Sequence, residues 1–169
     1  MEKEIYVVAP SITNQKCNQT ECFGSAIWLW IHSQNHRETP LYALPKILLP
    51  AISRNQFILI YENRKPIFFM SWANMNEISE KKYISKEFTK IKDEDWNSGE
   101  RTWIIDWIAP FGHTKAVAKY LKQQLLSNFI CRSLYHKNEE SDCKICFFKG
   151  KNISDEQATQ WLKAHPLAK

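Results

Sequence analysis

A histidine close to a serine, and an aspartate inside an apolar run, are the residues of this sequence best suited to acid–base chemistry. His36 follows Ser33 by three positions in SQNHR, so the two share a face if the preceding helix reaches them. Asp106 lies in WIIDWIAPFG, with Ile104 and Ile108 on its own strand face. A carboxylate placed there loses hydration and must be paired, hydrogen-bonded or protonated. A neutral imidazole oriented by such a carboxylate is a common general base.

The residues alone leave structural roles open for both groups. Asp106 could equally tie down the adjacent SGER loop through Arg101. His36, taken by itself, is better explained as a surface residue of the polar HRET loop. The expected helix after the Asp106 strand carries a basic stripe at i, i+4 and i+7, made of Lys115, Lys119 and Lys122. Such a stripe is usually solvated, but it could also dock an acidic partner.

The cysteines invite a metal hypothesis that the pattern does not favour. Cys17 and Cys22 form one close pair, and Cys143 and Cys146 form another. DCKICFF has the pattern of a strand, in which positions three apart point to opposite faces, unlike the tight turns of zinc ribbons. We therefore expect no bound metal and free thiols. The sequence also lacks GxSxG, HExxH and GxxxxGK[ST], so it gives no sign of those hydrolases, metalloproteases or nucleotide-binding proteins.

The composition indicates one globular domain. The chain has 169 residues, of which 44% are hydrophobic and 13% aromatic, and its formal net charge is +5. This excess of positive charge favours an acidic partner but is too small to indicate a nucleic-acid-binding protein. No apolar stretch approaches the roughly 18 residues of a membrane helix. The N-terminal MEKEIYVVAP resembles neither a secretory signal nor a transit peptide, so we expect a cytoplasmic protein.

The elements that must position these residues follow from periodicity. We expect strands at 57–62, 66–74, 102–108, 131–136 and 143–148, and helices at 25–35, 113–129 and 154–165, with a proline-interrupted helical piece at 41–55. Ser154 and Gln157 predict a capping box at the last helix. Residues 1–20 show no clear pattern and are expected to be an extension. The predicted class is mixed α/β (α+β), with helices around a central sheet.

Four segments carry a family resemblance: SAIWLW followed by HSQNHR, LPAI followed by NQF, PIFFMSWAN, and DEDWNSGERTWIIDWIAPFG. Together they resemble the RTX toxin-activating lysine acyltransferases, the family of the hemolysin- and cyclolysin-activating proteins. The resemblance runs from about residue 24 to residue 133 and continues more weakly to the end. Their order and spacing match throughout, and SG-x-R-x-W-x-IDWIAPF is highly specific.

The resemblance implies a single domain, over residues 21–169, with a fold like that of the GCN5-related N-acetyltransferases. It implies transfer of a fatty acyl group from acyl carrier protein to internal lysines of a protoxin in the cytoplasm, with no tightly bound cofactor. Carried over by motif, the catalytic pair is His36 and Asp106, and the motif serine is Ser33. Arg37 and Arg132 are then expected to bind substrate. The stripe of Lys115, Lys119 and Lys122 would contact the acidic carrier.

Three departures from the family pattern fall where donor or acceptor should bind. Gln34 replaces a proline, Tyr135 stands where the family usually has an arginine, and FFKGK replaces an FHGGK-like run. They keep a second hypothesis open, a transferase of the same fold that joins a siderophore-derived group to the C-terminus of a microcin peptide. A non-catalytic scaffold is a third, which the intact motifs argue against. Whether the protein forms a homodimer or a hetero-complex is left open by the sequence.

Overall fold

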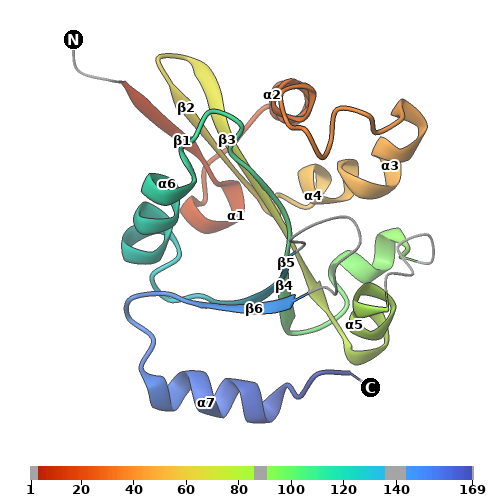
Figure 1. Ribbon diagram of the computed structural model, residues 1–169, viewed down its shortest axis with the longest axis vertical. Helices are drawn as coiled ribbons and strands as arrows, with labels where there is room; N and C mark the ends of the chain where they lie inside the picture. The colour runs from red at the N-terminus through yellow and green to blue at the C-terminus, as the bar shows by residue number, and fades with distance from the viewer. Residues whose placement is uncertain (1–3, 86–90, 136–143, 169) are drawn as a thin grey trace. The chain divides into compact units, whose positions relative to one another are not determined.

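Six strands form one mixed sheet flanked by helices in a computed structural model of the chain, which describes residues 4–85, 91–135 and 144–168 (Figure 1). The strand order is β1-β2-β3-β4-β5-β6. The predicted fold class is therefore confirmed. The chain divides into two compact units, which both contain parts of β3 and β4. The first is Met1–Trp72 with Asp106–Val117, and the second is Ala73–Ile105 with Ala118–Lys169.

The first unit contains an antiparallel meander of β1 (Ile5–Val8), β2 (Phe57–Glu62) and β3 (Lys65–Met75). The predicted hairpin is confirmed. Its turn residues Asn63 and Arg64 both have positive φ, at 49° and 65°, as a two-residue turn matching the twist of the strands requires. β1 was not predicted, because only four residues of the expected extension form it. Val8, at its end, pairs with Leu59 and is buried in the core.

The principal helix of the first unit is α2 (Gln19–Ile31), which begins and ends earlier than predicted. Its N-terminus is set by Asn18, whose side chain accepts hydrogen bonds from the backbone N–H groups of Thr20 and Glu21. A short helical turn precedes it at α1 (Pro10–Thr13), and others follow at η1 (Leu41–Ala43), α3 (Leu44–Ile47) and α4 (Leu49–Ser53). The buried core of the unit joins the sheet to these helices through Val8, Cys22, Ala26, Leu29, Trp30, Leu44, Leu48, Ile52, Phe57, Leu59, Phe69 and Ile108.

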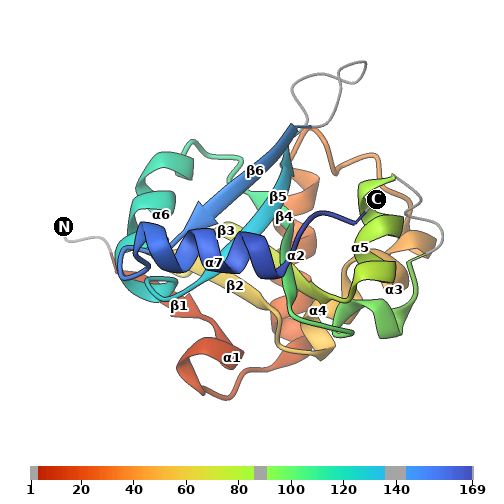
Figure 2. The same cartoon turned by 90° about the horizontal axis from the view of Figure 1, so that it is seen from below.

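The second unit contains the parallel part of the sheet. β4 (Arg101–Ile108) pairs in parallel with β5 (Ile130–Tyr135), and β5 pairs antiparallel with β6 (Lys144–Lys149). Its remaining elements are α5 (Glu77–Ile84), η3 (Asp93–Trp96), the π-helical η4 (Leu121–Leu125) and α7 (Asp155–Ala164). Figure 2 shows α7 running along β5 and β6, and the ring of Trp161 lies 6.2 Å from that of Phe147.

The helix predicted after the Asp106 strand is divided into two pieces. α6 (Thr114–Tyr120) is regular, and η4 follows it directly, with the Leu126 N–H donating to the Leu121 carbonyl at 2.7 Å. The capping box of α7 is confirmed, since the side chains of Ser154 and Gln157 each accept from the other's backbone N–H. Among the described residues, no helix has the length and apolarity needed to cross a membrane.

Candidate active site

A tight turn after α2 presents Ser33 and His36 together. The Ser33 carbonyl accepts hydrogen bonds from the backbone N–H groups of His36 and Arg37, each at 3.0 Å. The Ser33 hydroxyl lies 2.8 Å from Nδ1 of His36. The sequence predicted that the two residues share a face, but it assigned this to a helix running on to residue 35. Because α2 ends at Ile31, the turn brings them together, and His36 is not part of the helix terminus.

The strands of the first unit supply the carboxylate. Asp106 Oδ1 lies 3.3 Å from Nε2 of His36, so two residues 70 positions apart in sequence meet. Asp106 Oδ2 accepts a hydrogen bond from the hydroxyl of Ser71 on β3, at 3.0 Å. The alternative in which Asp106 ties down the SGER loop through Arg101 is not what the structure shows. Within the second unit, Arg101 pairs with Glu80 instead.

These contacts assign the protons of the imidazole. A carboxylate can only accept, so with Asp106 ionised the Nε2 atom of His36 carries the hydrogen and donates it. Nδ1 then has the free lone pair and accepts from the Ser33 hydroxyl. The resulting chain of hydrogen bonds is Ser71 to Asp106, His36 to Asp106, and Ser33 to His36. The arrangement makes Nδ1 the basic nitrogen.

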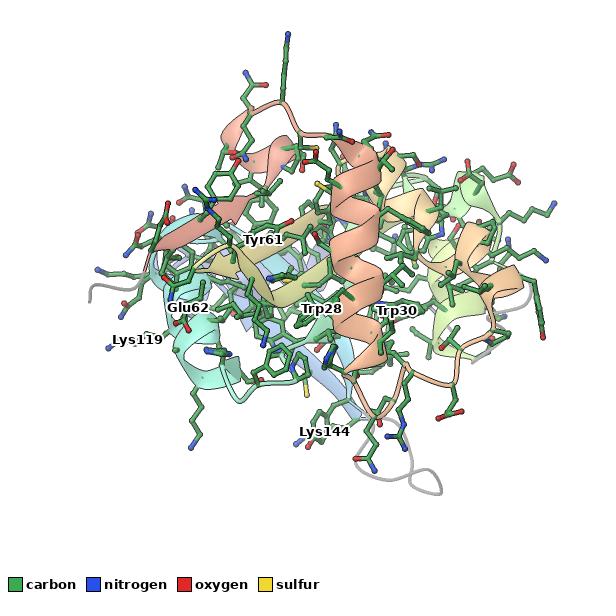
Figure 3. The ribbon with its side chains drawn as sticks, turned by 90° about the horizontal axis from the view of Figure 1, so that it is seen from above. Trp28, Trp30, Tyr61, Glu62, Lys119 and Lys144 are labelled. Atoms are coloured by element: carbon green, nitrogen blue, oxygen red, sulfur yellow. The ribbon has the colours of Figure 1, made fainter. Side chains whose placement is uncertain are left out.

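The site is shielded from water but not closed. The His36 side chain is 22% exposed and the Asp106 side chain 11%. The indole of Trp30, which is buried, covers one side of the imidazole with ring centroids 4.9 Å apart. Figure 3 shows Trp30 and Trp28 leaving α2 on different sides. A partly desolvated imidazole with one accessible face can exchange a proton with a bound substrate.

The structure keeps Arg132 away from solvent. This predicted substrate-binding residue is 3% exposed, and its guanidinium donates to Glu80 Oε1 at 3.0 Å and to the His165 carbonyl. Glu80, which is fully buried, also accepts from the indole of Trp103 and pairs with Arg101. Burial lowers the pKa of Arg132, and attraction to Glu80 opposes that lowering. A role in substrate binding stays a prediction for Arg132, whose hydrogen-bonding groups are occupied inside the second unit.

The other predicted contact residues are exposed. Arg37 lies beside the site turn and pairs with Glu38 at 3.3 Å. Lys115 and Lys119 lie on α6, and Lys122 lies at the start of η4. All three lysines are open to solvent, and Lys119 is labelled in Figure 3. Their part in docking is not tested by the geometry.

A groove of about 970 Å³ opens in the first unit beside the N-terminal half of α2. Tyr61, Trp28 and Gly24 are among its lining residues, whereas Ser33, His36 and Asp106 are not. At one end the Lys65 ammonium lies 5.2 Å from the ring centre of Trp28 and 4.7 Å from that of Phe111. The groove is therefore a feature separate from the hydrogen-bonded chain around His36.

Two buried thiols of the described residues, Cys22 and Cys131, are poor nucleophiles. Burial, with a smaller effect from the neighbouring Cys17, raises the pKa of Cys22 to about 12. Burial alone raises the pKa of Cys131 to about 12. Cys143 lies outside the described residues. Within the described ranges, no group of three or more histidine, cysteine, aspartate or glutamate side chains could hold a metal ion.

Ser71 is the member of the site that sequence reasoning missed. It stands in the apolar run PIFFMSWAN, two positions from Phe69 on the same strand face, and it is fully buried. A single hydroxyl inside such a run requires a hydrogen-bond partner. That requirement is the sequence signal that could have identified it, although only the fold shows that the partner is Asp106.

Comparisons with known proteins place these residues inside a matched region. The model of the RTX toxin acyltransferase family matches residues 15–149. The leukotoxin-activating lysine-acyltransferase LktC serotype A1 of Mannheimia haemolytica is 39% identical over 137 residues, which are 80% of each protein. The protein-lysine myristoyltransferase RtxC of Kingella kingae is 38% identical over 137 residues, 81% of each. The RTX-I toxin-activating lysine-acyltransferase ApxIC of Actinobacillus pleuropneumoniae is 38% identical over 147 residues, 87% of this chain and 84% of that protein.

Proposed function

Because the chain belongs to the RTX toxin acyltransferase family and is an acyltransferase, we propose that it transfers a fatty acyl group from acyl carrier protein to internal lysines of a protein toxin. One observation carries the assignment of the site. His36 lies between Asp106 and Ser33, with one ring nitrogen on each. In this proposal the catalytic domain covers residues 21–169, and residues 1–20 add β1 to its sheet. The reaction takes place in the cytoplasm.

The acceptor must lose a proton before it can react. A lysine amine has a pKa of about 10.4 in water and is mostly protonated at neutral pH. In the proposed mechanism, Nδ1 of His36 accepts the proton through the Ser33 hydroxyl, which gives its own proton to Nδ1 as it takes one from the amine. The imidazolium that results is stabilised by the Asp106 carboxylate. These are the roles that we assign to the three residues.

The bond changes balance without a covalent enzyme intermediate. The amine nitrogen attacks the thioester carbonyl carbon, and the carbon–sulfur bond breaks. The products are an amide on the lysine and a free thiol on the carrier. Two protons leave the lysine nitrogen. The first, taken from the ammonium before attack, is released from His36 to solvent. The second, taken as the carbon–nitrogen bond forms, passes through His36 to the departing thiolate, which returns the imidazole to its neutral form. No external oxidant, reductant or bound cofactor is required.

The exposed cations support a carrier-borne donor. Lys115, Lys119 and Lys122 lie on α6 and the segment after it, and acyl carrier proteins are acidic. α6 begins within APFGHTK, which has one glycine and so lacks a glycine-rich loop for a nucleotide pyrophosphate. Arg37 lies next to the site and is assigned to substrate contact. The docking surface that we propose does not include Arg132, because its guanidinium is buried.

Intact-mass analysis of an RTX protoxin tests the proposal. The protein is incubated with the protoxin and with acyl carrier protein charged with a myristoyl group. We expect the protoxin to gain the mass of one or more myristoyl groups, with peptide mapping placing them on internal lysines. Incubation with His36→Ala should give an unmodified protoxin. No gain in mass with the unmodified enzyme would favour a scaffold.

The same mass analysis, applied also to a small peptide precursor, distinguishes lysine acylation of a protoxin from the microcin hypothesis. A small peptide precursor whose C-terminal residue gains a siderophore-derived group, while the protoxin lysines stay free, would overturn the proposed acceptor. Trapping of a stable acyl group on Ser33 would overturn the direct mechanism instead. It would make the serine a nucleophile, with His36 still its base.

A further inference from the structure

Ser71 has a position that its neighbours in the strand do not explain. It is fully buried in β3, between Met70 and Trp72, which are also buried. Its hydroxyl donates to Oδ2 of Asp106 at 3.0 Å. Burying a polar side chain in such surroundings costs folding free energy unless the side chain makes a hydrogen bond. The contact therefore links the interior of the sheet directly to the carboxylate that faces His36.

The two oxygens of the Asp106 carboxylate accept hydrogen bonds from different partners, Oδ1 from His36 and Oδ2 from Ser71. Rotation of the carboxylate plane would break both contacts. A donor fixed on Oδ2 by a rigid strand thus holds Oδ1 toward Nε2 of His36.

We propose that Ser71 is a positioning residue that sets the tautomer of His36, by holding Asp106 so that Nε2 carries the hydrogen and Nδ1 keeps the basic lone pair. The inference rests on the proposed function, because the tautomer matters only if His36 is the base. Nδ1 is the nitrogen that faces Ser33. Loss of the Ser71 hydroxyl would free the carboxylate and let the hydrogen move to Nδ1, where it blocks proton uptake.

A second buried serine provides a matched control. Ser79, in the second unit, is 1% exposed and donates its hydroxyl to a carboxylate, that of Asp95. Asp95 is held in addition by the Lys82 ammonium and the backbone N–H of Lys92. Ser79→Ala therefore removes the same kind of hydrogen bond from the same kind of environment, without touching Asp106. Any general effect of deleting a buried hydroxyl should appear in both variants.

Long-range ¹H–¹⁵N spectra of the histidine rings test the proposal directly. The protein is labelled with ¹⁵N, and the signals of His36 among those of the five histidines are to be identified by their loss in His36→Gln. We expect the Nε2–H pattern for His36 in the unmodified protein and in Ser79→Ala. In Ser71→Ala we expect averaged shifts from two tautomers. An unchanged His36 pattern in Ser71→Ala would overturn the inference.

Kinetics supply the second readout. Ser71→Ala should lower kcat about tenfold, the effect of one lost hydrogen bond to a charged group, with KM for the charged carrier unchanged. Two further variants sharpen the NMR test. Ser71→Thr, which keeps the hydroxyl, should restore the Nε2–H pattern. If Ser71→Ala does not fold, Ser71→Cys, whose thiol is a weaker donor, should show the same averaged shifts, and a wild-type pattern in Ser71→Cys would also overturn the inference. Full activity of His36→Ala would instead remove the proposed function, whatever the spectra of the Ser71 variants show.

Discussion

Two carboxylates, one in each unit, show how differently the protein uses a negative charge with little access to water. In the second unit, Glu80 is fully buried and contacts two arginines, an indole N–H and the backbone N–H of Ala168. In the first unit, Asp106 is 11% exposed and is held by a serine hydroxyl and an imidazole. The two carboxylates therefore differ in how many hydrogen-bond donors they contact and in the chemical type of those donors.

This difference indicates which of the two clusters, the one around Glu80 or the one around Asp106, can take part in a reaction. The groups that hold Glu80 are guanidinium, indole and amide N–H groups, which only donate hydrogen bonds, so they offer no site that can accept a proton. The imidazole that contacts Asp106 has two ring nitrogens, one of which can accept a proton while the other donates to the carboxylate. It also keeps an accessible face, with 22% of its side chain exposed. A buried charge held only by donors is structural, whereas one held by a partly exposed group with a free proton acceptor can serve in catalysis.

The largest expected effect is on transfer by His36→Ala. Loss of a general base typically lowers the rate by about 10²- to 10⁴-fold, and the fold should be retained because the side chain is partly exposed. The rate is measured with charged carrier and protoxin, and folding by thermal denaturation. His32→Ala is the control, since this exposed neighbour donates through Nδ1 to the Trp28 carbonyl and does not contact Asp106. Equal losses in both variants would contradict a special role for His36.

Glu80→Gln should lower the stability of the fold and leave the transfer rate unchanged, the opposite of what we expect for His36→Ala. Removing one partner from a buried ion pair leaves an uncompensated charge, here on Arg132, and costs about 3–5 kcal/mol of unfolding free energy. Urea denaturation measures the loss, and the transfer rate of the folded fraction should be unchanged. Glu77→Gln is the control, because Glu77 is exposed and its nearest contact with Arg101 is 3.9 Å. Similar urea midpoints for all three proteins would show that the Glu80 cluster is not structural.

The pairing of His36 with Asp106 predicts a non-additive double mutant. Asp106→Asn alone should lose nearly as much rate as His36→Ala, because the amide cannot stabilise the imidazolium. The combined variant should lose little more than either one, since the two residues work as a unit. Rates of all three variants are compared under the same conditions. A double-mutant loss equal to the product of the single losses would indicate independent roles.

The sequence predicted the strongly patterned parts of the first unit. The hairpin strands and the Asp106 strand follow from apolar runs of strand length, and the structure places them at 57–62, 65–75 and 101–108. The pattern predicts a helix that continues to residue 35, across most of the turn that precedes His36, because SAIWLWIHSQN has no residue that ends a helix. β1 was missed because a four-residue strand carries almost no periodic signal.

The polar clusters were only partly accessible to sequence reasoning. Asp106 was conspicuous because a charge stood between two isoleucines. Glu80 gave no such signal, since it lies in EISEKKYI, which has the polar composition of an exposed helix. Its burial depends on Arg132 and Trp103 from distant strands. Contacts between residues far apart in sequence are fixed by the fold and cannot be derived from local pattern.

Charge reversal of the lysine stripe tests a third kind of charged group, one that is exposed to solvent. The triple change of Lys115, Lys119 and Lys122 to Glu should leave stability almost unaltered, because surface charges contribute little to folding. Affinity for acyl carrier protein should fall about tenfold at low salt and less at high salt. Isothermal titration at two ionic strengths measures both. Reversal of the exposed Lys46, Lys81 and Lys163 is the control with equal net charge. Equal affinities for the two triple variants would make the stripe merely solvated.

The last prediction concerns the space around one glycine in each unit, Gly24 in the first and Gly150 in the second. A Cβ atom at Gly24, on the groove wall of α2, would have nothing within 4 Å, whereas one at Gly150 would lie 2.2 Å from the carbonyl oxygens of Leu126 and Ser127. Gly24→Ala should therefore raise the free energy of unfolding by about 0.5–1 kcal/mol, the helix-interior difference between the two residues. Gly150→Ala should lower it, because backbone atoms must move. Urea midpoints measure both changes. If Gly24→Ala also lowers kcat/KM for one of the two substrates while stabilising the fold, that substrate uses the groove. Unchanged kinetics with a higher midpoint would show that the groove wall is free of both.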